Sequence, residues 1–282
     1  MKKILIPMML LYMGLSCNQS EDAPAPPSNL PAQDLMNVSY GTDPLQKMDV
    51  YLPAGRNDDT KVFILVHGGG WSGGSKAEFN YVVPILKSQF PNYAIVNMNY
   101  RLATMESPAF PKQIQDIEKV VDHIKSANYN ISSNIAFIGA SAGAHLSMLY
   151  SYKYDTNDDV KAVCTIVGPT DFTDPAYMTN PMFSYGAYYL IGNVNWQENP
   201  EIIAEVSPAL HVSSDSPPTI MFYGGQDPLI PVTQATRLKE KLDQYGVYNE
   251  YYLYQNGGHG NWNAATMIDF QSKLIGFFRE QF

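Results

Sequence analysis

The 282-residue sequence is poor in cysteine and in positive charge. It has two cysteines, Cys17 and Cys164, so no disulfide framework is expected, and Cys164 stands in an apolar run typical of a buried thiol. Eighteen Lys and Arg against 27 Asp and Glu give a net charge of -9, which argues against a nucleic-acid partner. The sequence has no His, Cys and carboxylate cluster at metal-ligand spacing and no G-x-G-x-x-G pattern. We therefore expect no metal and no cofactor.

The apolar run near the N-terminus, Ile4–Leu15, is too short to span a bilayer. It follows two lysines and precedes Ser16-Cys17, and the whole segment resembles a bacterial lipoprotein signal. That resemblance implies a lipid on Cys17 and attachment to the outer membrane, facing the periplasm or exposed at the surface. Gly14 stands where such signals usually have Leu, so cleavage by a general signal peptidase, giving a periplasmic or secreted protein, is the alternative.

We divide the chain into a signal segment (1–17), a flexible Pro- and Ala-rich tether (18–34) and a domain over 35–282. In the domain, apolar runs alternate with amphipathic stretches, which predicts an α/β fold with a mainly parallel sheet covered by helices on both faces. Strands are predicted at 37–40 and 48–52, as an antiparallel pair, and at 62–66, 93–99, 135–138, 160–167, 219–223 and 250–254. Helices are predicted at about 75–88, 111–127, 144–150, 232–245 and 261–282.

One interval, residues 168–216, follows the sixth predicted strand and contains no clear strand of its own. It is rich in aromatic residues: Phe172, Tyr177, Phe183, Tyr185, Tyr188, Tyr189 and Trp196. A long insertion in a compact domain is often a lid or a binding loop. The alternative is a helical excursion whose aromatic side chains pack on the core.

The sequence around Ser141 predicts a strand, a sharp turn and a helix. The run 135–138 leads into Gly139-Ala140-Ser141-Ala142-Gly143, and a helix-forming stretch follows. Small residues on both sides of Ser141 leave room for a strained turn where strand and helix pass closely. Such a turn exposes the Ser141 hydroxyl as a candidate nucleophile, with the positive end of the helix directed at it.

Four motifs, in order and in strand context, resemble the α/β-hydrolase fold. They are His67-Gly68-Gly69-Gly70-Trp71, Gly139-Ala140-Ser141-Ala142-Gly143, Gly224-Gly225-Gln226-Asp227 and Gly258-His259-Gly260. Within that fold the sequence is most similar to carboxylesterases related to hormone-sensitive lipase, particularly the bacterial acetylxylan and feruloyl-esterase-like branch. The resemblance covers nearly all of the chain from Val38 onward and implies a serine esterase.

A serine hydroxyl needs an adjacent base, and of the five histidines His259 has the best context. It lies in a glycine loop directly after the last predicted strand, at the sheet edge where ligands bind. Asp227 follows the preceding strand and is our candidate for the carboxylate that orients His259. Chain order is then Ser, Asp, His, as this fold requires. Asp171, after the sixth strand, is the alternative acid.

A tetrahedral intermediate also needs N–H donors for its oxyanion. The backbone amides of Gly68 and Gly69 are candidates, because glycine lets a loop approach the substrate closely, and Ala142, just after the nucleophile, completes the set. Trp71 either walls the substrate pocket or braces the glycine loop.

Three classes of function compete on this evidence. The first is a serine esterase acting on short acyl or feruloyl esters of plant polysaccharides or oligosaccharides. The second is another hydrolase on this fold: an arylformamidase, since the loop 67–71 also resembles that group, or a peptidase. The third is a non-catalytic surface binding protein, against which the intact set of Ser141, Asp227 and His259 argues. No sequence feature defines the oligomeric state.

Overall fold

The computed structural model describes residues 29–195 and 198–282. The predicted signal segment, most of the predicted tether and Trp196 lie outside the described residues. In the described part, eight strands form one sheet in the order β1-β2-β4-β3-β5-β6-β7-β8. The strands are β1 (Gln33–Ser39), β2 (Lys47–Leu52), β3 (Val62–Val66), β4 (Ala94–Met98), β5 (Ile135–Ala140), β6 (Val160–Ile166), β7 (Thr219–Gly224) and β8 (Asn249–Tyr254). β2 is antiparallel to β1 and to β4, and every other pair is parallel, so the predicted sheet is confirmed.

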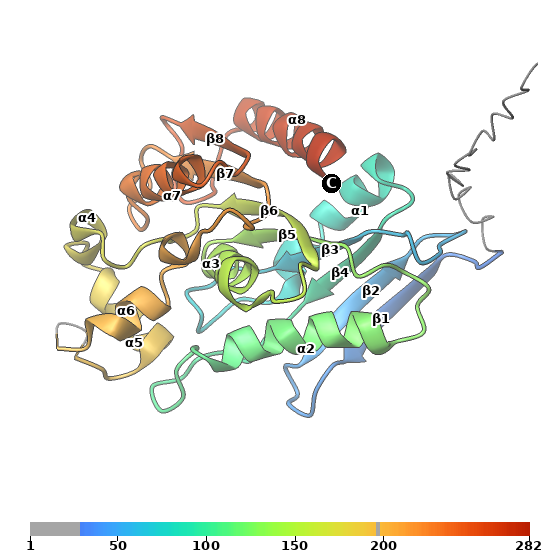
Figure 1. Ribbon diagram of the computed structural model, residues 1–282, viewed down its shortest axis with the longest axis horizontal. Helices are drawn as coiled ribbons and strands as arrows, with labels where there is room; N and C mark the ends of the chain where they lie inside the picture. The colour runs from blue at the N-terminus through green and yellow to red at the C-terminus, as the bar shows by residue number, and fades with distance from the viewer. Residues whose placement is uncertain (1–28, 196–197) are drawn as a thin grey trace, which may run out of the picture.

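Helices cover both faces of this sheet (Figure 1). They are α1 (Val82–Gln89), α2 (Lys112–Ser126), α3 (Ala142–Leu149), α4 (Pro175–Met178), α5 (Phe183–Ile191), α6 (Pro200–Glu205), α7 (Thr233–Gln244) and α8 (Ala264–Gln281), with short turns η1 (Lys76–Phe79), η2 (Tyr150–Tyr154) and η3 (Pro208–His211). The core under α2, α3 and α7 is separate from the core under α1 and α8. Within 29–195 and 198–282, no helix combines the length and the apolar character needed to cross a membrane.

The central strand β3 explains the two cores. Its side chains alternate between the faces, as in any strand: Val62, Ile64 and Val66 enter one core, Phe63 and Leu65 the other. All five residues are buried. An unbroken apolar run is therefore the sequence signature of a strand covered on both sides.

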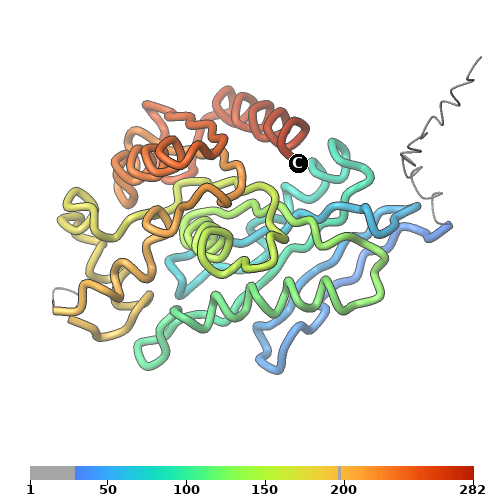
Figure 2. Tube along the Cα trace, viewed as in Figure 1, coloured from blue at the N-terminus to red at the C-terminus, as the bar shows by residue number. Residues whose placement is uncertain are grey.

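The insertion between β6 and β7 is helical, and it lies beside the segment that precedes α2 (Figure 2). The N–H groups of Ala109 and Phe110 donate to carbonyls of α5 at 2.8 Å. Its aromatic side chains do not all behave alike. Phe172, Tyr177 and Phe183 are buried in the core, whereas Tyr185 is 56% exposed. Core packing therefore explains the first three, and Tyr185 is left facing solvent.

Three elements differ most from the sequence predictions, and the other bounds agree within two residues. The helix expected at 75–88 is divided into η1 and α1, because Pro84 in the first turn of α1 has no N–H to bond a preceding turn and its ring would clash there. β1 begins at Gln33, inside the predicted tether, because Gln33 and Asp34 pair with β2. α8 begins after Asn263, whose side chain accepts a hydrogen bond from the N–H of Thr266.

Candidate active site

Ser141 lies at the apex of the turn between β5 and α3. Its backbone has φ +52° and ψ -119°, a left-handed conformation that costs a non-glycine residue on the order of 1–3 kcal/mol. The turn is possible because the chain passes very close to β3. A Cβ on Gly143 would lie 2.1 Å from the carbonyl oxygen of Val66 and 2.3 Å from that of His67. Only glycine fits there, as the sequence pattern predicts.

His259 connects Ser141 to Asp227. Its Nε2 lies 2.8 Å from Ser141 Oγ, and its Nδ1 lies 2.7 Å from Asp227 Oδ2. Nδ1 therefore donates to the carboxylate, which leaves Nε2 as the acceptor for the serine hydroxyl. The three residues follow β5, β7 and β8 at the carboxyl ends of parallel strands, which brings them to one sheet edge.

Asp227 is held in place by its own loop and by the insertion. Its side chain is fully buried, and Oδ1 accepts hydrogen bonds from the N–H groups of Leu229 and Ile230 at 2.8 and 3.0 Å. The side chain of Asn180, just after α4, donates to the carbonyls of Pro228 and Leu229 at 3.0 and 3.3 Å. The carboxylate therefore keeps one oxygen for His259 in a fixed orientation.

The alternative acid, Asp171, is engaged elsewhere. Its Oδ2 accepts from Arg237 Nε at 2.6 Å, and its Oδ1 accepts from the backbone N–H of Thr173 at 2.8 Å. Both carboxylate oxygens of Asp171 thus accept hydrogen bonds from groups other than His259. The structure thus brings Asp227, and not Asp171, to His259.

The other four histidines make separate contacts within the described residues. The ring of His67 stacks on Tyr100 with centroids 4.2 Å apart, and burial lowers its pKa. His123 bonds the Tyr129 hydroxyl at 3.0 Å. His211 donates to backbone carbonyls of the Ala204–Glu205 segment at 3.0 Å. Among the described residues, none of these three histidines bonds Ser141, and the only bond from His145 to Ser141 is the backbone one of α3, at 3.0 Å.

The backbone amides predicted to bind an oxyanion lie beside Ser141. A Cβ on Gly68 would lie 3.3 Å from Ser141 Cβ, so this loop runs against the nucleophile. In the described part of the chain, no acceptor takes the N–H of Gly68 or Gly69. Ala142 is the first residue of α3, where N–H groups have no partner inside the helix. The structure therefore leaves three donors near Ser141 for a ligand oxygen.

Trp71 is fixed by His145, a residue whose role was not apparent in the sequence. Trp71 Nε1 donates to His145 Nδ1 at 3.2 Å, and His145 Nε2 donates to the Val206 carbonyl at 2.7 Å. Burial lowers the pKa of His145 to about 4, so this ring is neutral at pH 7. Trp71 is only 4% exposed. It both braces the glycine loop and contributes one wall of the adjoining pocket.

Two pockets meet at Ser141 and His259. The smaller holds about 200 Å³ and the larger about 500 Å³. The smaller is lined mainly by Trp71, Tyr177, Met182, Tyr185, Leu229 and Ile230. The larger is lined by Glu78, Phe79, Tyr81, Ile166, Val167, Leu229 and Gly260. Both share Gly69 and Gly70, so the glycine loop lies at the boundary between them.

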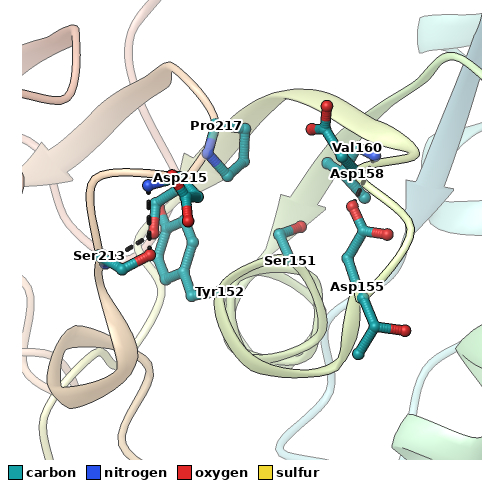
Figure 3. Close-up of a pocket in the computed structure, with 10 residues that line it drawn as sticks. Ser151, Tyr152, Asp155, Asp158, Val160, Ser213, Asp215 and Pro217 are labelled. Atoms are coloured by element: carbon teal, nitrogen blue, oxygen red, sulfur yellow. Dashed lines mark hydrogen bonds between the residues drawn. The ribbon is translucent and has the colours of Figure 1, made fainter.

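A third pocket, of about 640 Å³, lies at the opposite edge of the sheet, by the amino ends of β6 and β7 (Figure 3). Three carboxylates line it, and each has a local partner, Asp215 accepting from the Ser214 hydroxyl at 3.4 Å. Asp155 accepts from the N–H groups of Asp159 and Val160, and Asp158 pairs with Lys161 at 2.7 Å. Among the described residues, no group of three His, Cys, Asp or Glu could hold a metal ion.

Comparison with known protein families assigns the chain to one of them. The BD-FAE family matches residues 48–242, which include Ser141, Asp227 and the glycine loop. The chain belongs to the BD-FAE family. The sheet order and the solved structures below identify its fold as that of an α/β-hydrolase.

This BD-FAE chain is similar to several known esterases and solved structures. A structure described as a truncated form of a carbohydrate esterase from gut microbiota superposes with a TM-score of 0.74 at 25% identity, covering 91% of this chain and 99% of that one. A bifunctional GH43-CE protein of Bacteroides eggerthii gives 0.74 at 26%, covering 88% of this chain and 38% of the other. Esterase LipC of Mycobacterium tuberculosis is 29% identical over 243 residues, which are 79% of this chain and 59% of LipC. The chain thus spans about half the length, 45–59%, of the curated relatives it matches first.

Sequence reasoning identified the residues that meet at Ser141 but missed most of the pocket walls. Tyr177 and Tyr185 belong to the aromatic insertion, which was a usable signal. Glu78 and Tyr81 reach the larger pocket from η1 and the start of α1, where no motif marks them. These two residues are visible only once the chain is folded.

Proposed function

We propose that the protein is a serine-dependent carboxylic ester hydrolase that removes short acyl groups, chiefly acetyl, from plant polysaccharide or oligosaccharide. The observation that carries the proposal is the hydrogen-bonded series Ser141–His259–Asp227, with bonds of 2.8 and 2.7 Å, at the junction of two pockets. A series of this kind activates a serine hydroxyl on unrelated folds.

In the proposed mechanism, Ser141 Oγ attacks the ester carbonyl while its proton passes to His259 Nε2. Asp227 keeps the His259 ring in the tautomer with Nδ1–H and stabilises the imidazolium that forms. The N–H groups of Gly68, Gly69 and Ala142 bind the negative oxygen of the tetrahedral intermediate. His259 then returns the proton to the departing alcohol, leaving an acyl group on Ser141. A water that His259 deprotonates attacks this acyl-enzyme and releases the acid.

Two considerations support a short acyl ester of a carbohydrate as the substrate, one for the carbohydrate and one for the short acyl group. Of the two solved relatives described above, the one at 25% identity is described as a carbohydrate esterase and the one at 26% as a bifunctional GH43-CE protein. The smaller pocket, at about 200 Å³, lies below the range of about 300–1,000 Å³ that holds drug-sized ligands. That size favours an acetyl or another short acyl group, with feruloyl as the larger group to test. It argues against the long chains of a triglyceride.

We also propose that the protein is exported and tethered to the outer membrane by a lipid on Cys17, since an anchored esterase would meet extracellular polymers. The predicted lipoprotein signal supports this location. Export also counts against formylkynurenine as the substrate, because kynurenine chemistry is normally intracellular.

The experiment has two arms, labelling and turnover. The purified protein should react with a fluorophosphonate probe, and the Ser141→Ala variant should not, while keeping the same thermal unfolding curve. Acetate release from acetylated xylan should exceed ferulate release from feruloylated arabinoxylan, turnover of N-formylkynurenine and hydrolysis of triolein. No labelling of the wild type would refute the serine mechanism. Faster turnover of formylkynurenine or triolein would refute the substrate and leave the mechanism intact.

A further inference from the structure

The two pockets at Ser141 differ in volume and in the residues that line them. An ester has an acyl half and an alcohol half, which lie on opposite sides of the carbonyl carbon that Ser141 attacks. A site with two pockets at its nucleophile can therefore hold one half in each. The volume of each pocket and the residues that line it indicate which half each pocket receives.

The smaller pocket suits the acyl half. Trp71, Met182 and Ile230 supply an apolar lining, and the indole N–H of Trp71 is already bonded to His145. Ser72, Tyr177 and Tyr185 also line this pocket, but the side chains of Trp71, Met182 and Ile230 offer a ligand no free polar atom, and that part of the wall favours a hydrocarbon group. The volume of about 200 Å³ limits that group to a small one.

The larger pocket suits a polyhydroxylated alcohol. Its volume of about 500 Å³ is within the range of pockets that enclose whole small ligands. Tyr81 lines this pocket and is 59% exposed, so part of its ring is free to contact a ligand. An exposed tyrosine offers a flat apolar face with a polar tip, which matches the C–H face and the hydroxyl rim of a pyranose ring.

Glu78 adds a carboxylate to the same wall. Its Oε1 lies 3.3 Å from the N–H of Ser75, which fixes the start of η1. No donor among the described residues bonds its Oε2, so this oxygen is available to a sugar hydroxyl. The pocket therefore combines one stacking face with one acceptor, the combination that distinguishes a sugar from a simple alkyl alcohol.

We infer that the larger pocket is the alcohol subsite and that Tyr81 is a specificity-determining residue that stacks on the pyranose ring bearing the ester. The inference rests on the proposed esterase function. It adds the side of Ser141 on which the sugar lies and the side chain that selects it.

The test compares esters that share an acyl group and differ in the alcohol. The substrates are mono-acetylated methyl xyloside and methyl acetate, whose methanol is too small to stack on a ring. Tyr81→Ala should lower the ratio of kcat/KM for the xyloside to that for methyl acetate by about fivefold to tenfold, mainly through KM. Tyr81→Phe keeps the ring and should keep the ratio within about twofold. Tyr245 at the end of α7 is the matched control, because it is 44% exposed and lines neither pocket. Tyr245→Ala should leave kcat/KM for both esters unchanged.

The outcomes separate this inference from the proposed function. If the wild type cleaves neither ester, the proposed esterase function is refuted. If the wild type cleaves both and Tyr81→Ala leaves the ratio unchanged, the alcohol subsite is refuted and the esterase stands. A third measurement compares methyl butyrate with methyl acetate. If Tyr81→Ala changes that preference instead, the acyl group lies in the larger pocket and the assignment is overturned.

Discussion

The buried ring of His145 makes the free energy of unfolding of this protein depend on pH. The ring is fully buried between Trp71 and the Val206 carbonyl, and burial lowers its pKa from 6.5 to about 4. In the unfolded chain the same ring titrates near 6.5. Between these two values the unfolded state binds the proton and the folded state does not. Acidification through this window therefore favours unfolding.

The size of the effect follows from the two pKa values. A difference of 2.5 units, from 6.5 to about 4, corresponds to roughly 3 kcal/mol once the pH is below both. At pH 5 the loss relative to pH 7.5 is about 2 kcal/mol, because the unfolded ring is almost fully protonated there. The stability from this group is complete above pH 7 and falls as the pH drops below 6.5.

Urea unfolding at pH 7.5 and pH 5 measures this loss in the wild type and in His145→Gln. Glutamine retains a donor for the Val206 carbonyl but does not titrate. The variant should be less stable at pH 7.5, because the Trp71 indole loses its acceptor, and its further loss at pH 5 should be smaller by about 2 kcal/mol. Other titrating groups contribute to both proteins and cancel in the difference. Equal pH dependence in the two proteins would refute the assignment of a neutral buried His145.

Three further predictions follow from contacts described above. Asp227→Asn should lower kcat/KM on p-nitrophenyl acetate by about 10⁴-fold, whereas Asp171→Asn should weaken mainly stability through the lost Arg237 contact; equal losses of activity would contradict the choice of acid. Gly143→Ala should abolish folding or activity, since its Cβ would lie 2.1 Å from a backbone oxygen. The control Gly276→Ala in α8, where a Cβ would meet nothing within 4 Å, should raise the midpoint of thermal unfolding. A folded, active Gly143→Ala variant would show that the turn can relax. Cys17→Ser should leave the protein unprocessed or release it in soluble form, and it should abolish palmitate labelling; a processed variant with the membrane association of the wild type would exclude the lipid anchor.

The sheet was predictable because its signals are local. β3 is a five-residue apolar run, and the sequence prediction matches its bounds, since a strand buried on both faces has no polar position to blur its ends. The prediction of one helix at 75–88 was wrong for an equally local reason. Pro84 interrupts it, and periodicity alone does not register a missing N–H.

The site was predictable only where motif residues carry it. Ser141 and His259 stand in glycine-rich turns, which mark them in the sequence. Tyr81 has no such context, because its position beside Ser141 arises from the folding of η1 and α1 over the ends of other strands. The role of His145 could not be predicted, because its bond to Trp71 joins residues that are 74 positions apart in the chain.

The two hydrogen bonds from Asn180 to the Pro228 and Leu229 carbonyls limit how this enzyme scaffold can be re-engineered. Insertions of this kind are attractive cassettes for exchange between homologues, because they form much of a substrate pocket. Here the cassette also supports the loop that carries Asp227. A graft that lacks an amide donor at position 180 would bring in a new pocket wall. It would also lose the hydrogen bonds to Pro228 and Leu229, which directly follow Asp227, and so loosen the Asp227 carboxylate. Chimeras should therefore carry residues 228–230 together with the transplanted insertion.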